Sequence, residues 1–376
     1  MVAATSTYRL FVAVSPGLEG LLEQELVGLG LSPKPLAGGV EVSGELSALW
    51  AIHLKSRLAE NVRLRLKPFR AKSFPELVGE LSKLPWHAYL RPGRALDVSV
   101  TCHKSRLYHS GAVAERVREV IEARLGAPAL PPATDGNGQR VFVRLDHDGV
   151  QVSVDASGER LHKRGYRSHV GAAPLRETLA AALALQLETA SGEGAATPVW
   201  DPFCGSGTLL TEWLLLCAKR PPGAHRRFGF EDWPIHDPRA YAAFVEQQPL
   251  GVELSEVRAI GSDHSAAAIA AARENSQRAG LRAACRFITA DFREAVRQIP
   301  EGTRVLTNPP YCVRLAPGGA GRLLRQLERV LLERSDLRPV VLATTDRSYP
   351  TRSRLGWRPA LSFKSGGLSV QALVVS

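Results

Sequence analysis

The sequence lacks the cysteine pattern of a disulfide framework or a zinc site. Its five cysteines are scattered along 376 residues, whereas both kinds of site need closely spaced pairs. They are Cys102, Cys204, Cys217, Cys285 and Cys312. A long apolar run is also missing near the start, where Phe11 to Val14 is too short for a secretory core or a membrane span. We therefore expect a cytoplasmic protein that holds no metal and is not bound to a membrane.

Positive charge, in contrast, is abundant. Lysine and arginine number 48 against 37 acidic residues, which gives a formal net charge of +11 and a pI near 9.7. Such a surface attracts a polyanion, because each phosphate that it neutralises releases condensed counterions. The 44% of hydrophobic residues suffice for two or three separate cores. The composition thus predicts a multidomain protein with nucleic acid as its partner, and an anionic membrane surface is the alternative.

The front part of the chain has the pattern of small mixed α/β units. Leucines at helical spacing predict a helix over residues 18–26, and strict alternation predicts a strand over residues 62–66. Around that strand Arg63, Arg65 and Lys67 form a basic outer face, which we interpret as a candidate RNA surface. The segment 140–155 alternates on both sides of Asp148-Gly149, which predicts a β-hairpin with its turn there.

A basic stretch from Gly158 to Arg167 marks a change of composition and a linker. It is either a solvated loop or a nucleic-acid contact. The second interpretation gains weight because Tyr166 could stack on a base while Arg164 and Arg167 hold phosphates.

The back half alternates strands and helices, as an α/β domain does. An apolar strand over 197–200 enters the loop Asp201 to Thr208, and a helix over 209–218 follows. Gly205 and Gly207 allow the backbone to approach a ligand at a helix N-terminus. The loop has neither the full dinucleotide fingerprint nor the Gly-Lys-Ser/Thr of a phosphate loop, which disfavours NAD and ATP.

Two acidic residues follow the next two strands of this half. Asp263 ends one strand, where its carboxylate can accept both hydroxyls of a ribose, and Asp291 ends the next, where it can accept from an adenine amino group. Each alone could be an ordinary helix cap. Together, and after a glycine loop, they predict an adenosyl pocket.

The motif Asn308-Pro309-Pro310-Tyr311 ends a further apolar strand and predicts the chemistry. An exocyclic amine of guanine or adenine is a poor nucleophile, since its lone pair is delocalised into the ring. The Asn308 side-chain oxygen and the Pro309 carbonyl could accept its two N–H groups and direct the lone pair toward a methyl donor, while Tyr311 stacks on the base. The pattern therefore predicts an S-adenosylmethionine-dependent methyltransferase of an amino nitrogen, which reaches a paired base only if that base flips out.

With these motifs the sequence resembles the THUMP-domain RNA methyltransferases, and within them the bacterial 23S ribosomal RNA guanine-N2 group. The likeness also rests on 161–166, on Ala173 to Leu179 and on an insertion containing Pro221 to Trp233. It implies an α/β fold with a ferredoxin-like domain over 1–60, a THUMP domain over 61–157, a linker over 158–176 and a Rossmann-like methyltransferase domain over 177–376. The chain departs from the family where Cys312-Val313 replaces the usual Gly-Glu.

The resemblance also implies the residues of each site. Catalytic residues are Asn308, Pro309, Pro310 and Tyr311. Residues that bind S-adenosylmethionine are Thr178, Asp201, Phe203, Gly205, Ser206, Gly207, Asp263, Asp291 and Asn308. Independently of the resemblance, the basic side chains that we predict to contact RNA are Lys104, Arg106, Lys163, Arg164 and Arg167.

The predicted function is formation of N2-methylguanosine in structured RNA, with ribosomal RNA favoured and transfer RNA possible. An adenine-N6 methyltransferase of RNA or DNA and a glutamine-amide methyltransferase use the same motif, although the basic front part speaks against a protein substrate. A noncatalytic RNA-binding or ribosome assembly factor is the alternative from another class, which the altered loop after Tyr311 allows.

Overall fold

The computed structural model describes residues 7–132, 138–167, 175–192, 197–249, 251–310 and 319–376. The chain forms two compact units. Unit 1 comprises residues 1–14, 22–161 and 226–248, and unit 2 comprises 15–21, 162–225 and 249–376. The predicted α/β class is confirmed. Within the described ranges, no helix has the length and apolar character needed to span a membrane.

Unit 1 contains an eight-stranded sheet with the order β2-β3-β1-β4-β8-β7-β6, and β5 pairs with β8 beside it. Its first elements are β1 (Tyr8–Ala13), α1 (Glu19–Gly28), β2 (Pro33–Leu36), β3 (Gly39–Gly44), α2 (Leu46–Lys55) and β4 (Asn61–Arg65). Alternation along β1 and β4 buries one face, where Leu10, Val12, Val62 and Leu64 are at most 2% exposed. The predicted helix and strand are thus confirmed.

The basic face of β4 is covered by neighbouring strands. Arg65 forms an ion pair with Glu41 of β3, and the Arg63 guanidinium lies 3.8 Å from the centre of the Phe142 ring. Both side chains are half-buried, and only Lys67 is exposed. The interpretation of all three as an open RNA surface is therefore wrong for the two arginines.

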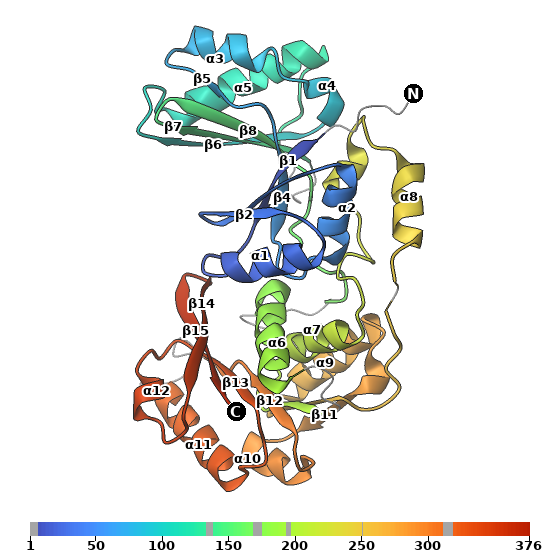
Figure 1. The fold of residues 1–376 in the computed structure, drawn as a ribbon, viewed down its shortest axis with the longest axis vertical. Coiled ribbons are helices and arrows are strands. Elements are labelled where there is room, and N and C mark those ends of the chain that lie inside the picture. Colours follow the sequence, from blue (N-terminus) through green and yellow to red (C-terminus); the bar gives the residue numbers. More distant parts are fainter. Residues whose placement is uncertain (1–6, 133–137, 168–174, 193–196, 250, 311–318) are drawn as a thin grey trace. The chain divides into compact units, whose positions relative to one another are not determined.

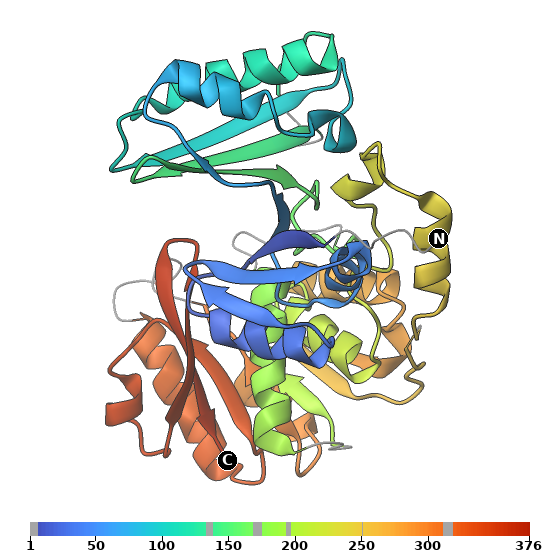
Figure 2. The same cartoon turned by 45° about the horizontal axis from the view of Figure 1, so that its top comes forward.

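The second part of unit 1 continues the sheet. Its elements are β5 (Phe69–Arg70), α3 (Phe74–Leu81), α4 (Trp86–Tyr89), β6 (Leu96–His103), α5 (Ser110–Leu125), β7 (Gln139–Asp146) and β8 (Gly149–Asp155). Figure 2 shows α3 and α5 on one face of β6, β7 and β8. The predicted hairpin is confirmed, but its turn lies one residue earlier than expected, since His147 and Asp148 have φ of 50° and 62°. Two successive positive φ values are typical of the type I′ turn that suits a twisted hairpin.

A segment from the back half of the chain completes unit 1. It holds η1 (Gly229–Asp232) and α8 (Pro238–Glu246), the latter drawn in yellow beside α2 in Figure 1. Trp50 of α2 packs against Tyr241 and Phe244, with ring centres 5.6 Å apart in each pair. The Phe230 amide donates to the Ala156 carbonyl at 2.8 Å, which fixes the segment to the end of β8.

Unit 2 has a seven-stranded sheet with the order β11-β10-β9-β12-β13-β15-β14. The strands are β9 (Val199–Asp201), β10 (Ala259–Asp263), β11 (Cys285–Thr289), β12 (Arg304–Thr307), β13 (Val340–Thr344), β14 (Arg358–Ser365) and β15 (Leu368–Val375). The helices are α6 (Glu177–Ser191), α7 (Thr208–Cys217), α9 (Ala266–Arg278), η2 (Arg282–Ala284), α10 (Phe292–Ala295), η3 (Val296–Gln298), α11 (Gly319–Glu333) and α12 (Tyr349–Arg352). The first five strands in the sheet order are parallel, and the terminal hairpin is antiparallel.

Two helical layers cover this sheet. Helices α10 and α11 bury Phe292, Leu327 and Leu331 against Trp200 and Val305 in one apolar cluster. Helices α6, α7 and α9 lie on the opposite face (Figure 1). Both faces of β9, β10, β12 and β13 are therefore buried, whereas the edge strand β11 has exposed residues at Arg286 and Thr289.

Candidate cofactor and amine-binding site

The predicted site segments meet at one edge of the unit 2 sheet. Strand β9 pairs with β10 on one side and with β12 on the other, all in parallel. Asp201 and Asp263 are the last residues of β9 and β10, and Asn308 directly follows β12. The strand order reverses between β9 and β12, and ligands of open α/β sheets bind at the carboxyl ends of the strands at such a point.

Asp201 joins the two strands at this reversal. Its Oδ1 accepts hydrogen bonds from the Thr307 hydroxyl at 2.8 Å and from the Phe203 amide at 3.0 Å. The side chain is buried, and this burial raises the pKa of Asp201 to about 7. Asp201 therefore fixes the start of the glycine loop relative to the strand that carries Asn308.

The glycine loop leaves free space beside the carboxylate of Asp263. The Gly205 amide donates to Oδ2 of Asp263 at 3.1 Å, and the φ of Gly205 is 51°. A Cβ built on Gly205 would meet no atom within 4 Å, whereas one on Gly207 would lie 3.1 Å from Cβ of Ala272. Gly207 is thus required for helix packing, and Gly205 borders free space. The carbonyl of Ser206 accepts a hydrogen bond from the Asn275 side chain at 3.0 Å, which holds the glycine loop against α9.

Asp263 has the character of a ribose acceptor. Its Oδ1 accepts from the Ser265 amide at 2.9 Å and its Oδ2 from Gly205, so each oxygen keeps a lone pair. Two carboxylate oxygens beside a loop with free space match the two neighbouring hydroxyls of an adenosyl ribose. The residues present therefore fit S-adenosylmethionine.

Asp291 is in a different situation. It caps α10 by accepting from the Arg293 amide, and the Arg293 guanidinium binds its two oxygens at 2.7 and 3.0 Å. These bonds lower the pKa of Asp291 below its usual value. The helix-cap interpretation is confirmed, and the contact to an adenine amino group stays a prediction. Phe203 and Phe292 pack with ring centres 4.9 Å apart, which gives this corner an apolar wall.

Thr178 lies in the first turn of α6 and is 1% exposed. Its hydroxyl has no hydrogen-bond partner among the described residues. A buried hydroxyl without a partner costs free energy, and a bound ligand can supply what is missing. The predicted cofactor contact of Thr178 stays a prediction.

The end of β12 opens into a small cavity of about 200 Å³. Pro309 and Pro310 line it together with Leu324 of α11, Thr344 at the end of β13 and Asp346 just after that strand. Neither proline has an amide hydrogen, so their backbone presents only carbonyl acceptors. Tyr311, Cys312 and Val313 lie outside the described residues.

The predicted RNA contacts in the linker are buried. Arg164 is 3.8 Å from Glu212, to which the Tyr166 hydroxyl donates at 2.9 Å. Arg167 forms an ion pair with Glu177 at 3.1 Å. Arg164 and Tyr166 are at most 6% exposed, and the Arg167 side chain is 9% exposed. The structure thus contradicts the interpretation of these three residues as exposed RNA contacts, because their charges and hydroxyl face acidic residues inside unit 2.

The other predicted RNA contacts are exposed. Lys163 lies in the same stretch but points outward, and Lys104 and Arg106 follow β6 in unit 1. Lys104 has a φ of 45°, and the Arg106 amide donates to Asp148 at 2.8 Å. These three side chains remain candidates for RNA.

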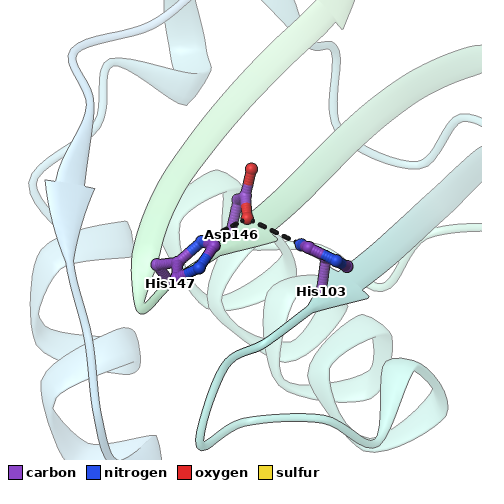
Figure 3. A group of neighbouring side chains, drawn as sticks. All are labelled: His103, Asp146 and His147. Carbon is purple, nitrogen blue, oxygen red and sulfur yellow. Dashed lines mark hydrogen bonds and ion pairs between the residues drawn. The ribbon is translucent and has the colours of Figure 1, made fainter.

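The sequence interpretation missed a cluster beside Lys104 (Figure 3). The Nδ1 atoms of His103 and His147 lie 2.9 and 2.8 Å from Oδ1 of Asp146, and Arg144 binds its other oxygen at 3.2 Å. The first three residues could hold a metal ion. Hydrogen bonds already join Nδ1 of each histidine to Asp146, and the absence of a metal at this cluster stays a prediction. The cluster forms through the parallel pairing of His103 in β6 with Asp146 in β7, which no local sequence pattern indicates.

Comparison with known proteins identifies the family. Residues 164–355 match the family model described as "RMKL-like, methyltransferase domain", and residues 9–63 match "RlmL ferredoxin-like domain". A predicted N6-adenine-specific DNA methylase from Listeria monocytogenes is 29% identical, with a TM-score of 0.82 over 98% of this chain and 96% of that chain.

Two further solved structures share the fold along their length. A possible methylase from Clostridium difficile is 27% identical, with a TM-score of 0.81 over 98% of both chains. The putative methyltransferase SMU.472, solved in complex with SAH, is 24% identical, with a TM-score of 0.82 over 99% of this chain and 98% of that chain. The protein is a methyltransferase that uses S-adenosylmethionine, and it belongs to the RMKL-like methyltransferase family.

Proposed function

We propose that the protein forms N2-methylguanosine in 23S ribosomal RNA. One observation carries the amine chemistry: Asn308 and Pro309 follow β12 at the strand reversal, next to the strand that enters the glycine loop. The Asn308 side-chain oxygen and the Pro309 carbonyl at this position suit the two N–H groups of an exocyclic amine.

The residues divide the work as follows. S-adenosylmethionine supplies an electrophilic methyl group on a positively charged sulfur. Asp263 holds the ribose, and the Asn308 side chain and the Pro309 carbonyl accept from the amine and orient its lone pair. The cavity beside Pro309 and Pro310 encloses the edge of the base. A strong general base is unnecessary, because the proton on the nitrogen becomes acidic once that nitrogen is methylated.

RNA as the substrate is supported by charge and exposure. The chain has a net charge of +11, and Lys104, Arg106 and Lys163 are exposed. We assign residues 61–157 to an RNA-binding THUMP domain, with a ferredoxin-like domain over 1–60, a linker over 158–176 and the methyltransferase domain over 177–376. The preference for guanine N2 rests on the resemblance of the motifs to the 23S group.

Two other functions compete with this one. The Listeria protein of similar fold is described as a predicted adenine-N6 DNA methylase, and a transfer RNA guanine-N2 enzyme would use the same site. The noncatalytic assembly factor is disfavoured by the site itself, since Asp201, Asp263 and the glycine loop are all in place for a cofactor.

The test is transfer of labelled methyl from S-adenosylmethionine to separate pools of unmodified ribosomal RNA, transfer RNA and DNA, followed by nucleoside identification. We expect N2-methylguanosine in large-subunit RNA. Asn308→Ala should reduce the rate about 100-fold, as loss of a transition-state hydrogen-bonding group does. Gln298→Ala, an exposed change in the same unit, is the matched control. Label in DNA as N6-methyladenine, or no transfer to any pool, would contradict the proposal.

A further inference from the structure

Unit 1 contains a cavity of about 530 Å³ that belongs to none of the residues discussed as catalytic or cofactor-binding. Three distant stretches of the chain line it: the residues between α4 and β6, the hairpin strands β7 and β8, and the segment 226–233. The segment 226–233 packs closely against the residues that follow β8, since a Cβ on Gly229 would lie 2.7 Å from the amide nitrogen of Gly158. The volume is in the range of small-ligand sites.

Arginines dominate the lining of this cavity. They are Arg91, Arg94, Arg140, Arg226 and Arg227, against the carboxylates of Asp155, Glu159 and Asp232. Two of them hold the backbone in place: the Arg91 side chain donates to the Asp232 carbonyl at 2.7 Å, and the Arg226 side chain donates to the Arg160 carbonyl at 2.8 Å. The local excess of positive charge favours an anion.

Two of the arginines are available to a ligand. Arg94 is exposed, and its side chain makes no hydrogen bond or ion pair with the described residues. Arg227 is 77% exposed, and its contacts to Glu231 and Asp232 are both 3.4 Å long. Exposed ion pairs of this kind contribute little and exchange readily. Phosphate groups could therefore bind both guanidinium groups at little cost.

Asp155 places a hydrogen-bond acceptor on the cavity wall, in contrast to the arginines, which donate. It is 5% exposed, and its Oδ1 accepts from Asn61 at 2.6 Å and from the Ser157 amide at 3.1 Å. Its Oδ2 is buried and has no hydrogen-bond partner among the described residues. A buried carboxylate oxygen without a donor is costly, which points to a donor that arrives with a ligand.

A ligand for this cavity must satisfy both features. Inorganic phosphate can meet the arginines and donate a P–OH group to Asp155, but it fills only a small part of a cavity of about 530 Å³. A nucleotide carries phosphates for Arg94 and Arg227 and also an N–H or O–H group for the carboxylate. Among the aromatic rings of the wall, Phe228 stacks on Phe230 with ring centres 5.6 Å apart, and Tyr89 packs edge to face with Trp233 at 5.2 Å. These rings thus already have ring partners and do not offer a free stacking platform.

We propose that this cavity binds one unpaired nucleotide of the RNA substrate, with phosphates on Arg94 and Arg227 and a base N–H or ribose hydroxyl donated to Asp155. The proposal rests on the proposed function, since it takes RNA as the substrate. Recognition is then polar and not by stacking, which predicts a strong dependence of affinity on salt.

The test measures RNA affinity against salt concentration by fluorescence anisotropy, with the full-length chain, no methyl donor and a labelled single-stranded fragment of 23S RNA. The double variant Arg94→Ala/Arg227→Ala should lower the slope of log affinity against log salt by about 1.4, because each lost phosphate contact on a single strand removes about 0.7. The control Arg124→Ala/Arg239→Ala removes the same charge from exposed positions of unit 1 outside the cavity and should leave the slope near wild type.

A second variant tests the carboxylate. Asp155→Asn keeps the acceptor for Asn61 and Ser157 but places an amide donor where Oδ2 was. We expect RNA affinity to fall about fivefold, on the scale of one hydrogen bond, with the salt slope unchanged. Circular dichroism of each variant shows whether the fold is kept.

The outcomes separate the two proposals. Equal slopes for the cavity and control double variants would overturn the cavity proposal and leave the proposed function intact. A wild-type chain that binds no RNA would overturn both proposals, whereas RNA binding without methyl transfer would overturn only the proposed function.

Discussion

Each unit has a buried aspartate at the end of a strand, and the two differ in the hydrogen-bond donors to their carboxylate oxygens. Asp201 in unit 2 has both donors to its Oδ1 from its own motif and from the strand beside it. Asp155 in unit 1 has one oxygen satisfied and the other without a donor among the described residues. The first aspartate links two strands beside the glycine loop, and the second has a buried oxygen that a ligand can satisfy.

The two sites also differ in how the chain builds them. The unit 2 site comes from consecutive strand-loop-helix units, whose parallel strands bring each loop to one edge. The unit 1 cavity needs residues 89–95, the β7–β8 hairpin and a segment from 226 onward. Local motifs therefore describe the first site, and no local motif describes the second.

The largest expected effect compares the two acids of the cofactor site. Asp263→Ala should weaken S-adenosylmethionine binding about 50-fold, since hydrogen bonds to a charged acceptor contribute about 1.5–3 kcal/mol. Asp291→Ala should have a smaller effect, because Arg293 already donates three hydrogen bonds to this carboxylate, two to Oδ1 and one to Oδ2. Isothermal titration calorimetry measures both, and RNA binding is the control. An equal loss in the two variants would contradict the different roles that we assign to these acids.

An effect of similar size in free energy is expected on stability as pH changes. The pKa of Asp201 is raised to about 7 by burial, so between about pH 4 and pH 7 the folded state holds a proton that the unfolded state has released. The contribution of Asp201 to the free energy of unfolding therefore falls as pH rises through this window, by on the order of 3 kcal/mol.

Chemical denaturation of wild type and Asp201→Asn at several pH values measures this contribution. The asparagine keeps an acceptor for Thr307 and Phe203 but does not titrate, so its stability should vary less between pH 5 and pH 8, values that lie on either side of about 7. Parallel pH curves for the two proteins would show that the Asp201 carboxyl is not perturbed by burial.

The glycines of the two units offer a matched pair for a smaller change still. Gly207 and Gly30 have φ of 80° and 79°, so alanine is strained by about 1 kcal/mol at either position. Only at Gly207 would the new Cβ meet a neighbour, at 3.1 Å from Cβ of Ala272. Gly207→Ala should therefore lower the free energy of unfolding by more than Gly30→Ala, as denaturant titration would show. Equal losses would mean that the glycine loop is less tightly packed than described.

Sequence periodicity predicted the elements better than it predicted the surroundings of charged residues. The helix with buried Leu22 and Leu26, the β7–β8 hairpin and the strands before Asp201 and Asp263 all follow from spacing. Charge alone could not show that Arg164 and Arg167 face Glu212 and Glu177, because those acids lie on helices 10 to 48 residues further along the chain.

The domain limits likewise could not be predicted from sequence spacing alone. Continuous stretches were expected, yet residues 226–248 pack with unit 1, through contacts such as that of Trp50 with Tyr241. Aromatic residues in an insertion indicate that it packs against another part of the chain, but they do not identify the surface that it contacts. The cavity lined by Arg94 and Arg227 could therefore be found only in three dimensions.

The smallest effect is expected from removal of metal ions. Transfer of a methyl group from a sulfonium to an amine needs no Lewis acid, and Asp146 already binds His103, His147 and Arg144. Treatment with EDTA followed by desalting should leave both RNA affinity and methyl transfer unchanged. If EDTA weakened RNA binding and His147→Asn had the same effect, the cluster would hold a cation that contributes to RNA recognition. The substitution suits this test, because asparagine accepts the positive φ of 50° at this turn position.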